Sequence, residues 1–139
     1  MNKTLLDTDI FSEVLKAKDA GVVARAAAYH AQFRHYTLAS ITVMEIVKGL
    51  HKLQQPGRIQ RFVNQLSHVE IIGFDTGPAE LAGRIYGDLE RLGQPIGRAD
   101  PMIAAIALHH GLTLTTGNGR HYERIQALGY ALPLDNWRL

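Results

Sequence analysis

Short apolar runs alternate with helix-length segments along the chain, and no two-residue hairpin turn joins two of the apolar runs. Neighbouring strands that lack hairpins must be linked by longer crossovers, which are usually helices and which make the strands parallel. The alternation therefore predicts an α/β fold. We expect a mostly parallel central sheet of four to five short strands, flanked by about seven helices that cover both of its faces.

The boundaries of these elements follow from apolar periodicity and from helix-breaking residues. From Thr42 onwards, for example, apolar side chains recur at i, i+3, i+4 and i+7 until Pro56 and Gly57 interrupt the pattern. The expected strands are residues 4–6, 35–38, 69–74, 112–115 and 130–134. The expected helices are residues 10–16, 20–33, 42–55, 59–66, 75–92, 100–111 and 120–128.

Length and composition limit the class of protein. A chain of 139 residues without repeats or linkers is one domain, residues 1–139, since domains average roughly 100 to 200 residues. The absence of cysteine excludes disulfides, thiolate metal sites and a cysteine nucleophile, and it indicates a reducing compartment. No apolar run approaches the roughly 18 residues of a membrane span, so we expect a cytoplasmic protein without membrane contact. A formal charge of +2 permits contact with phosphates without requiring it.

Acidic and amide side chains gather where the expected strands end. Asp7 and Asp9 follow the first strand, Glu45 lies in the helix after the second, Asp100 begins the helix before the fourth, and Asn118 follows the fourth. Because parallel strands end at one edge of the sheet, we expect these five side chains to lie together. Two carboxylates about 4 Å apart repel by about 4 kcal/mol at an effective dielectric of 20, so such a cluster needs protons or a cation.

Ligands that are all oxygen select magnesium or manganese rather than zinc. An ion of this kind supplies an activated water and neutralises charge on a phosphate, which favours phosphodiester hydrolysis. The sequence lacks other catalytic signatures: it has no P-loop, no Gly-x-Ser-x-Gly elbow and no His-Glu-x-x-His pair. The acidic constellation is therefore its main indication of chemistry.

Other interpretations of these residues stay open. Helix capping is an alternative role for Asp9, for Asp100 before Pro101, and for Glu45 in a capping box with Thr42. A tight turn is an alternative role for Asn118 between two glycines. Asp7 ends a strand, where we expect no capping role.

The pair Asp7-x-Asp9 is also similar to the acids of haloacid-dehalogenase-like phosphatases, although Phe11 stands where those enzymes usually carry Thr or Val.

Five segments carry a family resemblance: LLDTDIF, ASITVMEIVKGL, IGRADPMIAAIALHHGLTLTTGN, RHYERI and LPLDNW. In this order they resemble the PIN-domain ribonucleases, and more closely the VapC-type toxins of bacterial toxin-antitoxin pairs. The resemblance implies that Asp7, Glu45 and Asp100 are the core catalytic acids. Asn118 occupies the place of a fourth member that is often Asp, and Thr116 matches the small hydroxyl residue of the same motif.

The sequence departs from the family pattern at two acidic positions. Asp9 stands where many relatives carry Asn, and Asn118 is neutral. We expect one firm magnesium site that uses Asp7 and Asp100, with Glu45 as a further carboxylate ligand, directly or through water, and a second site that fills with substrate. Asp9 and Thr116 would support the site, and Asn118 would orient a metal-bound water.

The resemblance further implies a Mg²⁺-dependent endoribonuclease in which Mn²⁺ can substitute, acting as the toxin of a VapBC-type pair. Its expected partners are an RNA substrate, a VapB-type antitoxin that covers the acidic pocket, and a second copy in a homodimer. Lys48, Arg98 and Arg120 are candidate RNA backbone contacts, with solvated surface charge as the alternative. Phe11, Val14 and Leu15, which we expect to be exposed apolar residues of the first helices, would serve the antitoxin or the core. A catalytically silent PIN-like binding module is the remaining alternative.

Overall fold

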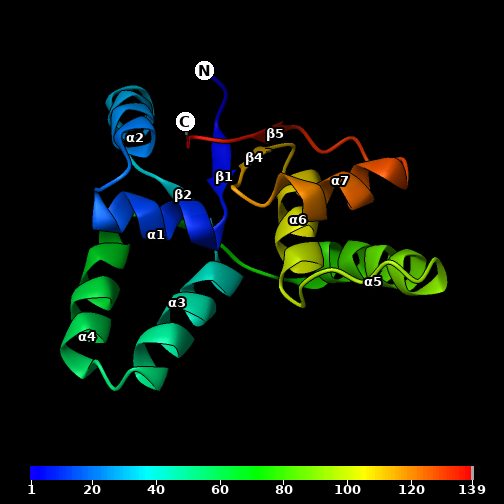
Figure 1. Ribbon diagram of the computed structural model, residues 1–139, viewed down its shortest axis with the longest axis horizontal. Helices are drawn as coiled ribbons and strands as arrows, with labels where there is room; N and C mark the ends of the chain where they lie inside the picture. Colours follow the sequence, from blue (N-terminus) through cyan, green and yellow to red (C-terminus); the bar gives the residue numbers. More distant parts are fainter. Residues whose placement is uncertain (139) are drawn as a thin grey trace.

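The protein is described by a computed structural model that covers residues 1–138. Within this range its five strands form one parallel sheet in the order β3-β2-β1-β4-β5. Figure 1 labels β2, β1, β4 and β5 among the surrounding helices. The strands are β1 (Thr4–Leu6), β2 (Thr37–Ala39), β3 (Glu70–Ile72), β4 (Thr113–Thr115) and β5 (Leu134–Asp135). The predicted α/β class with a parallel sheet is confirmed.

Seven α-helices and one 3-10 turn surround the sheet in the described range. They are α1 (Thr8–Lys16), α2 (Ala20–Phe33), α3 (Ser40–Lys52), α4 (Pro56–Gln65), η1 (Leu66–His68), α5 (Thr76–Arg91), α6 (Asp100–His109) and α7 (Gly119–Ala127). None of these helices has the length and apolar character needed to cross a membrane.

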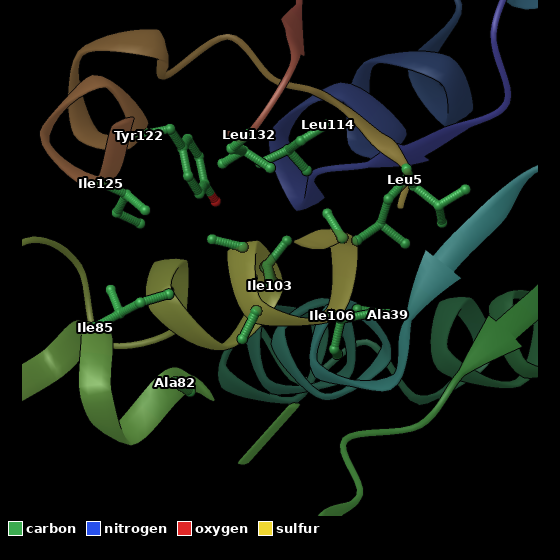
Figure 2. Close-up of a cluster of buried hydrophobic side chains, with 14 of the residues drawn as sticks. Leu5, Ala39, Ala82, Ile85, Ile103, Ile106, Leu114, Tyr122, Ile125 and Leu132 are labelled. Atoms are coloured by element: carbon green, nitrogen blue, oxygen red, sulfur yellow. The ribbon is translucent and has the colours of Figure 1, made fainter. Parts of the chain in front are cut away.

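The central strand β1 sends alternate side chains into two hydrophobic cores. Leu5 belongs to a core with α5, α6 and α7, and Leu6 to a core with α1, α2 and α4. Successive side chains of a strand point to opposite faces, so helices must cover both faces of this short strand. Figure 2 shows the first core, in which Ile103 and Ile106 of α6 meet Leu114 of β4.

The last strand begins four residues later than expected. Residues 130–133 form no strand, and only Leu134–Asp135 pairs with β4. Gly129 adopts a positive φ of 102°, and Pro133 has no N–H to contribute to a ladder. The apolar run was therefore a poor guide to the length of this strand.

The chain after β5 crosses the second core. Trp137 is 2% exposed, and its ring centroid lies 5.6 Å from that of Tyr29 on α2. This contact carries the next residue, Arg138, across the sheet toward α1, where it approaches Asp9 and Glu13. The last residues of the described chain thus contribute directly to the edge where β1 ends.

Candidate active site

Asp7 is the most enclosed acid of the site. It follows β1, and its backbone N–H donates to the carbonyl of Thr115 at 2.9 Å, which extends the pairing of β1 with β4. Its carboxylate is 3% exposed and accepts three hydrogen bonds: from the Thr8 backbone at 2.9 Å, the Thr116 hydroxyl at 2.8 Å and the Tyr122 hydroxyl at 3.0 Å. Asp7 is also the N-cap of α1, so the expectation that it has no capping role is wrong.

Asp100 reaches the same hydroxyl from another helix. It is the first residue of α6 after the cap residue Ala99, so it is not the N-cap that its place before Pro101 indicated. The Tyr122 hydroxyl lies 3.3 Å from Asp100 Oδ1, and His121 Nδ1 lies 2.9 Å from Asp100 Oδ2. Asp7 and Asp100 therefore approach each other across one phenol.

Asp9 completes what we call the aspartate cluster, namely Asp7, Asp9 and Asp100. Asp9 Oδ2 accepts from the Gly117 N–H at 2.9 Å and lies 3.6 Å from the Arg138 guanidinium. A Cβ at Gly117 would collide with that guanidinium and would lie 2.6 Å from Asp9 Oδ2. Glycine at this position is therefore what allows the tail to pack against the cluster.

Burial and mutual repulsion disfavour the charged forms of Asp7 and Asp9. Burial, followed by the nearby charge of Asp9, raises the pKa of Asp7 to about 6. Burial also raises the pKa of Asp9, while the Gly117 N–H and Arg138 oppose that shift. The pKa of the Tyr122 phenol is raised well above its ordinary value by burial and by the two neighbouring aspartates, so Tyr122 stays a neutral donor. A cation near Asp7 would relieve this electrostatic cost.

Glu45 lies beside the cluster without joining it. The helix α3 begins at Ser40 after the cap residue Ala39, so Thr42 is inside the helix and the predicted capping box is absent. Instead, the Thr8 hydroxyl lies 2.6 Å from Glu45 Oε1 and 3.0 Å from the Thr42 hydroxyl. Since the backbone of Thr8 also binds Asp7, this one residue connects Glu45 to the cluster.

Thr116 and Asn118 lie in the turn after β4, as expected. Thr116 is 1% exposed, and its hydroxyl donates to Asp7 and accepts the Asn118 backbone N–H at 2.9 Å. Asn118 precedes α7 at the N-cap position, where its side chain is exposed and makes no capping hydrogen bond. The side chain is therefore available to solvent and substrate.

A groove of about 520 Å³ leads away from Glu45 between α1, α3 and α4. Its near end is lined by Thr8 and Glu45, and its other lining includes the basic residues Lys16, Arg58 and Arg61. Figure 1 shows these three helices on the opposite side of the sheet centre from α5. The groove is thus continuous with the acidic edge and carries positive charge.

The other surface expectations have mixed outcomes. Leu15 is 44% exposed and lines the groove, whereas Phe11 is 3% exposed and belongs to the second core. Lys48, Arg98 and Arg120 are exposed, and none of them forms an ion pair with another residue in the range 1–138. Their role as RNA contacts stays a prediction.

The donor set fits a hard divalent cation held largely by water. Within residues 1–138, no three His, Asp or Glu side chains form a ready cage for a metal ion. Magnesium, however, is usually held by one or two carboxylates together with several waters and substrate phosphates. Asp7 and Asp100 meet that requirement because each reaches the Tyr122 hydroxyl and each carries further oxygen lone pairs.

Three residues of the site were not expected from the sequence: His121, Tyr122 and Arg138. His121 and Tyr122 belong to the RHYERI segment, which begins two residues after Asn118, and this position was a signal for a place near the acids. Arg138 gave no local signal, because only the packing of Trp137 brings it to Asp9.

The sequence profile of the PIN domain matches residues 4–128. The chain belongs to the PIN-domain family. The haloacid-dehalogenase-like alternative is thereby excluded, and the family resemblance of the sequence segments is confirmed.

Similar proteins place the chain among the VapC members of this family. A protein of Shigella flexneri named tRNA(fMet)-specific endonuclease VapC is 35% identical over 132 residues, covering 92% of this chain and 96% of that protein. Ribonuclease VapC2 of Haemophilus influenzae is 33% identical over 138 residues, covering 99% of both. Among solved structures, the DNA-bound VapBC of Salmonella typhimurium contains a chain with a TM-score of 0.81 and 32% identity, with 99% of both chains covered.

Proposed function

We propose that this VapC-family protein is an Mg²⁺-dependent endoribonuclease, with Mn²⁺ able to substitute, and that it acts as the toxin of a VapBC-type pair in the cytoplasm. The observation that carries the proposal is the enclosed aspartate cluster, which Thr8 connects to Glu45 at the near end of a basic groove. Relatives named as ribonucleases support the reaction class. The basic groove suits the phosphate backbone of RNA, and the acids suit hydrolysis of its phosphodiester bonds.

Each site residue has a distinct part in this reaction. Asp7 and Asp100 would hold the ion, which when bound supplies charge stabilisation on the phosphate and acidifies water. Asp9 and Thr116 keep Asp7 in place through the turn after β4. Glu45, at the near end of the groove, accepts a proton from the attacking water. The water oxygen bonds to phosphorus as one P–O ester bond breaks. Asn118 orients that water, and the leaving oxygen takes a proton from solvent.

Positive residues on two sides would hold the RNA backbone. Lys48, Arg98 and Arg120 each lie two or three residues from a site residue in the sequence. Arg58 and Arg61 line the groove. Such contacts position the strand without reading its bases. Binding should therefore weaken steeply as salt rises.

The groove also suits the expected VapB-type antitoxin. Its floor includes Leu15, Leu50 and Phe62, and its basic lining complements acidic side chains. A partner segment with apolar and acidic residues laid in this groove would end at Glu45 and block the acids. Self-association into a homodimer stays a separate prediction, which sedimentation of the isolated protein tests.

Cleavage of RNA with defined metals tests the proposed function. The purified protein is expected to cut RNA with Mg²⁺ or Mn²⁺ and to stop when a chelator is in excess. The variant Asp100→Asn should lose cleavage, whereas Asp88→Asn, which removes the same charge on the outer surface of α5, should retain it.

A catalytically silent module would behave differently in two measurements. It would cut no RNA with either metal, and millimolar Mg²⁺ would leave its melting temperature unchanged. An ion that binds only the folded state must stabilise it, by about 2.7 kcal/mol at one hundred times its dissociation constant. Chelator-resistant cleavage would equally reject the proposed mechanism.

A further inference from the structure

The Tyr122 side chain joins an apolar core to the acidic site. Its ring is fully buried beside Ile125 and Leu132, and Figure 2 shows its hydroxyl oxygen directed toward α6. That oxygen lies 3.0 Å from Asp7 Oδ2 and 3.3 Å from Asp100 Oδ1. One rigid side chain therefore spans the two carboxylates that the proposed function assigns to the ion.

Core packing alone does not account for the hydroxyl. A phenylalanine ring would fill the same apolar space, and a buried hydroxyl costs free energy unless it is hydrogen-bonded. Tyr86 illustrates the contrast, because its buried hydroxyl has no hydrogen-bond partner in residues 1–138. The hydroxyl of Tyr122 has two acidic partners, and it can donate its single proton to one of them at a time.

The two contacts anchor one oxygen of each carboxylate. Asp7 Oδ2 and Asp100 Oδ1 face the phenol, whereas Asp7 Oδ1 and Asp100 Oδ2 face away from it and each has one protein contact, to the Thr8 N–H and to His121 respectively. A carboxylate oxygen has two lone pairs, so each of these oxygens keeps one for a further ligand. The ring is held by the core, and it therefore fixes the spacing and the rotation of both carboxylates.

We propose that Tyr122 is a positioning residue of the cation site, holding Asp7 and Asp100 in the orientation that binds the ion. This inference rests on the proposed function. Hydrogen-bond partners of metal-binding carboxylates typically contribute 10- to 100-fold in metal affinity or activity. Without the hydroxyl, the two like-charged groups are free to rotate away from each other.

The variant Tyr122→Phe tests this role by direct metal binding. Mn²⁺ affinity, measured on the RNA-free protein by electron paramagnetic resonance, is expected to fall by roughly 10- to 100-fold. Cleavage should be restored in part when Mn²⁺ is raised by the same factor. Tyr36→Phe is the matched control, because it removes a phenol that donates to the Ala26 carbonyl at 3.2 Å, away from the acids. Its Mn²⁺ affinity should match the wild type.

The remaining outcomes separate this inference from the proposed function. Wild-type Mn²⁺ affinity in a folded Tyr122→Phe protein overturns the role of Tyr122 and leaves the proposed function intact. Absence of Mn²⁺ binding by the wild type itself overturns both. A second variant, Tyr122→Leu, separates hydroxyl from ring: equal losses of affinity in both variants support the inference, and a loss only in Tyr122→Leu rejects it.

Discussion

The aspartate cluster and Glu45 are neighbours with opposite surroundings. Asp7 is almost fully buried, accepts three hydrogen bonds and has a raised pKa. Glu45 is half-buried, is hydrogen-bonded by Thr8 and opens on a groove. The first region is assembled from the end of β1 and from α1, α6 and α7, whereas Glu45 belongs to α3 and lies on the groove between α1, α3 and α4. The contrast indicates that the cluster presents enclosed carboxylates with fixed positions, whereas Glu45 is accessible to a molecule bound in the groove.

This division of roles predicts different consequences for similar substitutions. Changes in the cluster should alter both metal binding and the stability of the fold. Changes at Glu45 should alter catalysis while leaving the folded protein as it is.

The largest effect is expected for Asp7→Asn. Loss of a metal-binding carboxylate should reduce RNA cleavage by more than the roughly 100-fold typical of its hydrogen-bond partners. The same change should stabilise the metal-free protein. The pKa of Asp7 rises from 3.8 to about 6 on folding, so the protonated form stabilises the fold below pH 4 and this contribution is lost as pH rises to 6.

The lost contribution amounts to about 3 kcal/mol above pH 6, from 1.36 kcal/mol per pKa unit. Melting temperatures in chelator at pH 4 and pH 7.5 measure it: the wild type should lose more stability than Asp7→Asn between these values. Asp75→Asn provides a control outside the cluster. Parallel pH profiles for wild type and Asp7→Asn would show that the burial cost of Asp7 is relieved in another way.

The next largest effect is expected for Glu45→Gln. Loss of a general base typically costs 10²- to 10⁴-fold in rate, so kcat should fall by at least about 100-fold. The melting temperature and the Mn²⁺ affinity should stay near wild-type values, because Glu45 lies outside the cluster. A loss of Mn²⁺ affinity as large as that of Asp100→Asn would instead make Glu45 a metal ligand and remove the distinction between the two regions.

A smaller effect, on stability, is expected for Gly117→Ala. The added Cβ collides with the Arg138 guanidinium and lies 2.6 Å from Asp9 Oδ2, so the tail must shift. Overpacking of this kind costs about 1–3 kcal/mol, which denaturant unfolding measures. Gly83→Ala on α5 is the matched control, since nothing lies within 4 Å of its Cβ and alanine favours a helix. Equal behaviour of the two variants would argue against close packing of the tail.

The smallest effect is expected for Thr8→Val, which removes the hydroxyl that connects the two regions. Hydrogen bonds to charged groups contribute about 1.5–3 kcal/mol, and the lower end of this range, about tenfold in rate, is expected if the bond orients Glu45 in the transition state. Single-turnover cleavage kinetics measure this. An unchanged rate would indicate that Glu45 acts without the help of Thr8.

The sequence was informative about the site where chain order alone determines position. Asp7, Thr116 and Asn118 follow strands that end at one edge of a parallel sheet, and Asp100 opens the helix that leads to β4, so their neighbourhood was predictable. Capping roles were less predictable because they depend on the exact first residue of a helix. The helix α3 begins two residues before the expected position, and Ala99 rather than Asp100 is the cap residue of α6.

Tertiary orientation decided the remaining features. Tyr122 reaches the acids because the packing of α7 on the first core turns its ring inward, and no local pattern specifies that direction. Arg138 depends on a contact between residues more than one hundred positions apart in the chain, Trp137 with Tyr29. The length of β5 also differs from the apolar run, because Gly129 adopts a positive φ and Pro133 has no N–H to contribute to a ladder.

The buried Trp137 also has a genetic consequence. The tryptophan codon UGG becomes a stop codon through one base change, and the resulting protein would keep every acid of the site while losing a large side chain from the second core. Removal of a buried aromatic ring costs about 3–5 kcal/mol, a large part of the 5–15 kcal/mol that keeps a typical domain folded. If the protein arrests growth, colonies that survive its expression should therefore include nonsense alleles at this codon, alongside missense alleles at the aspartates.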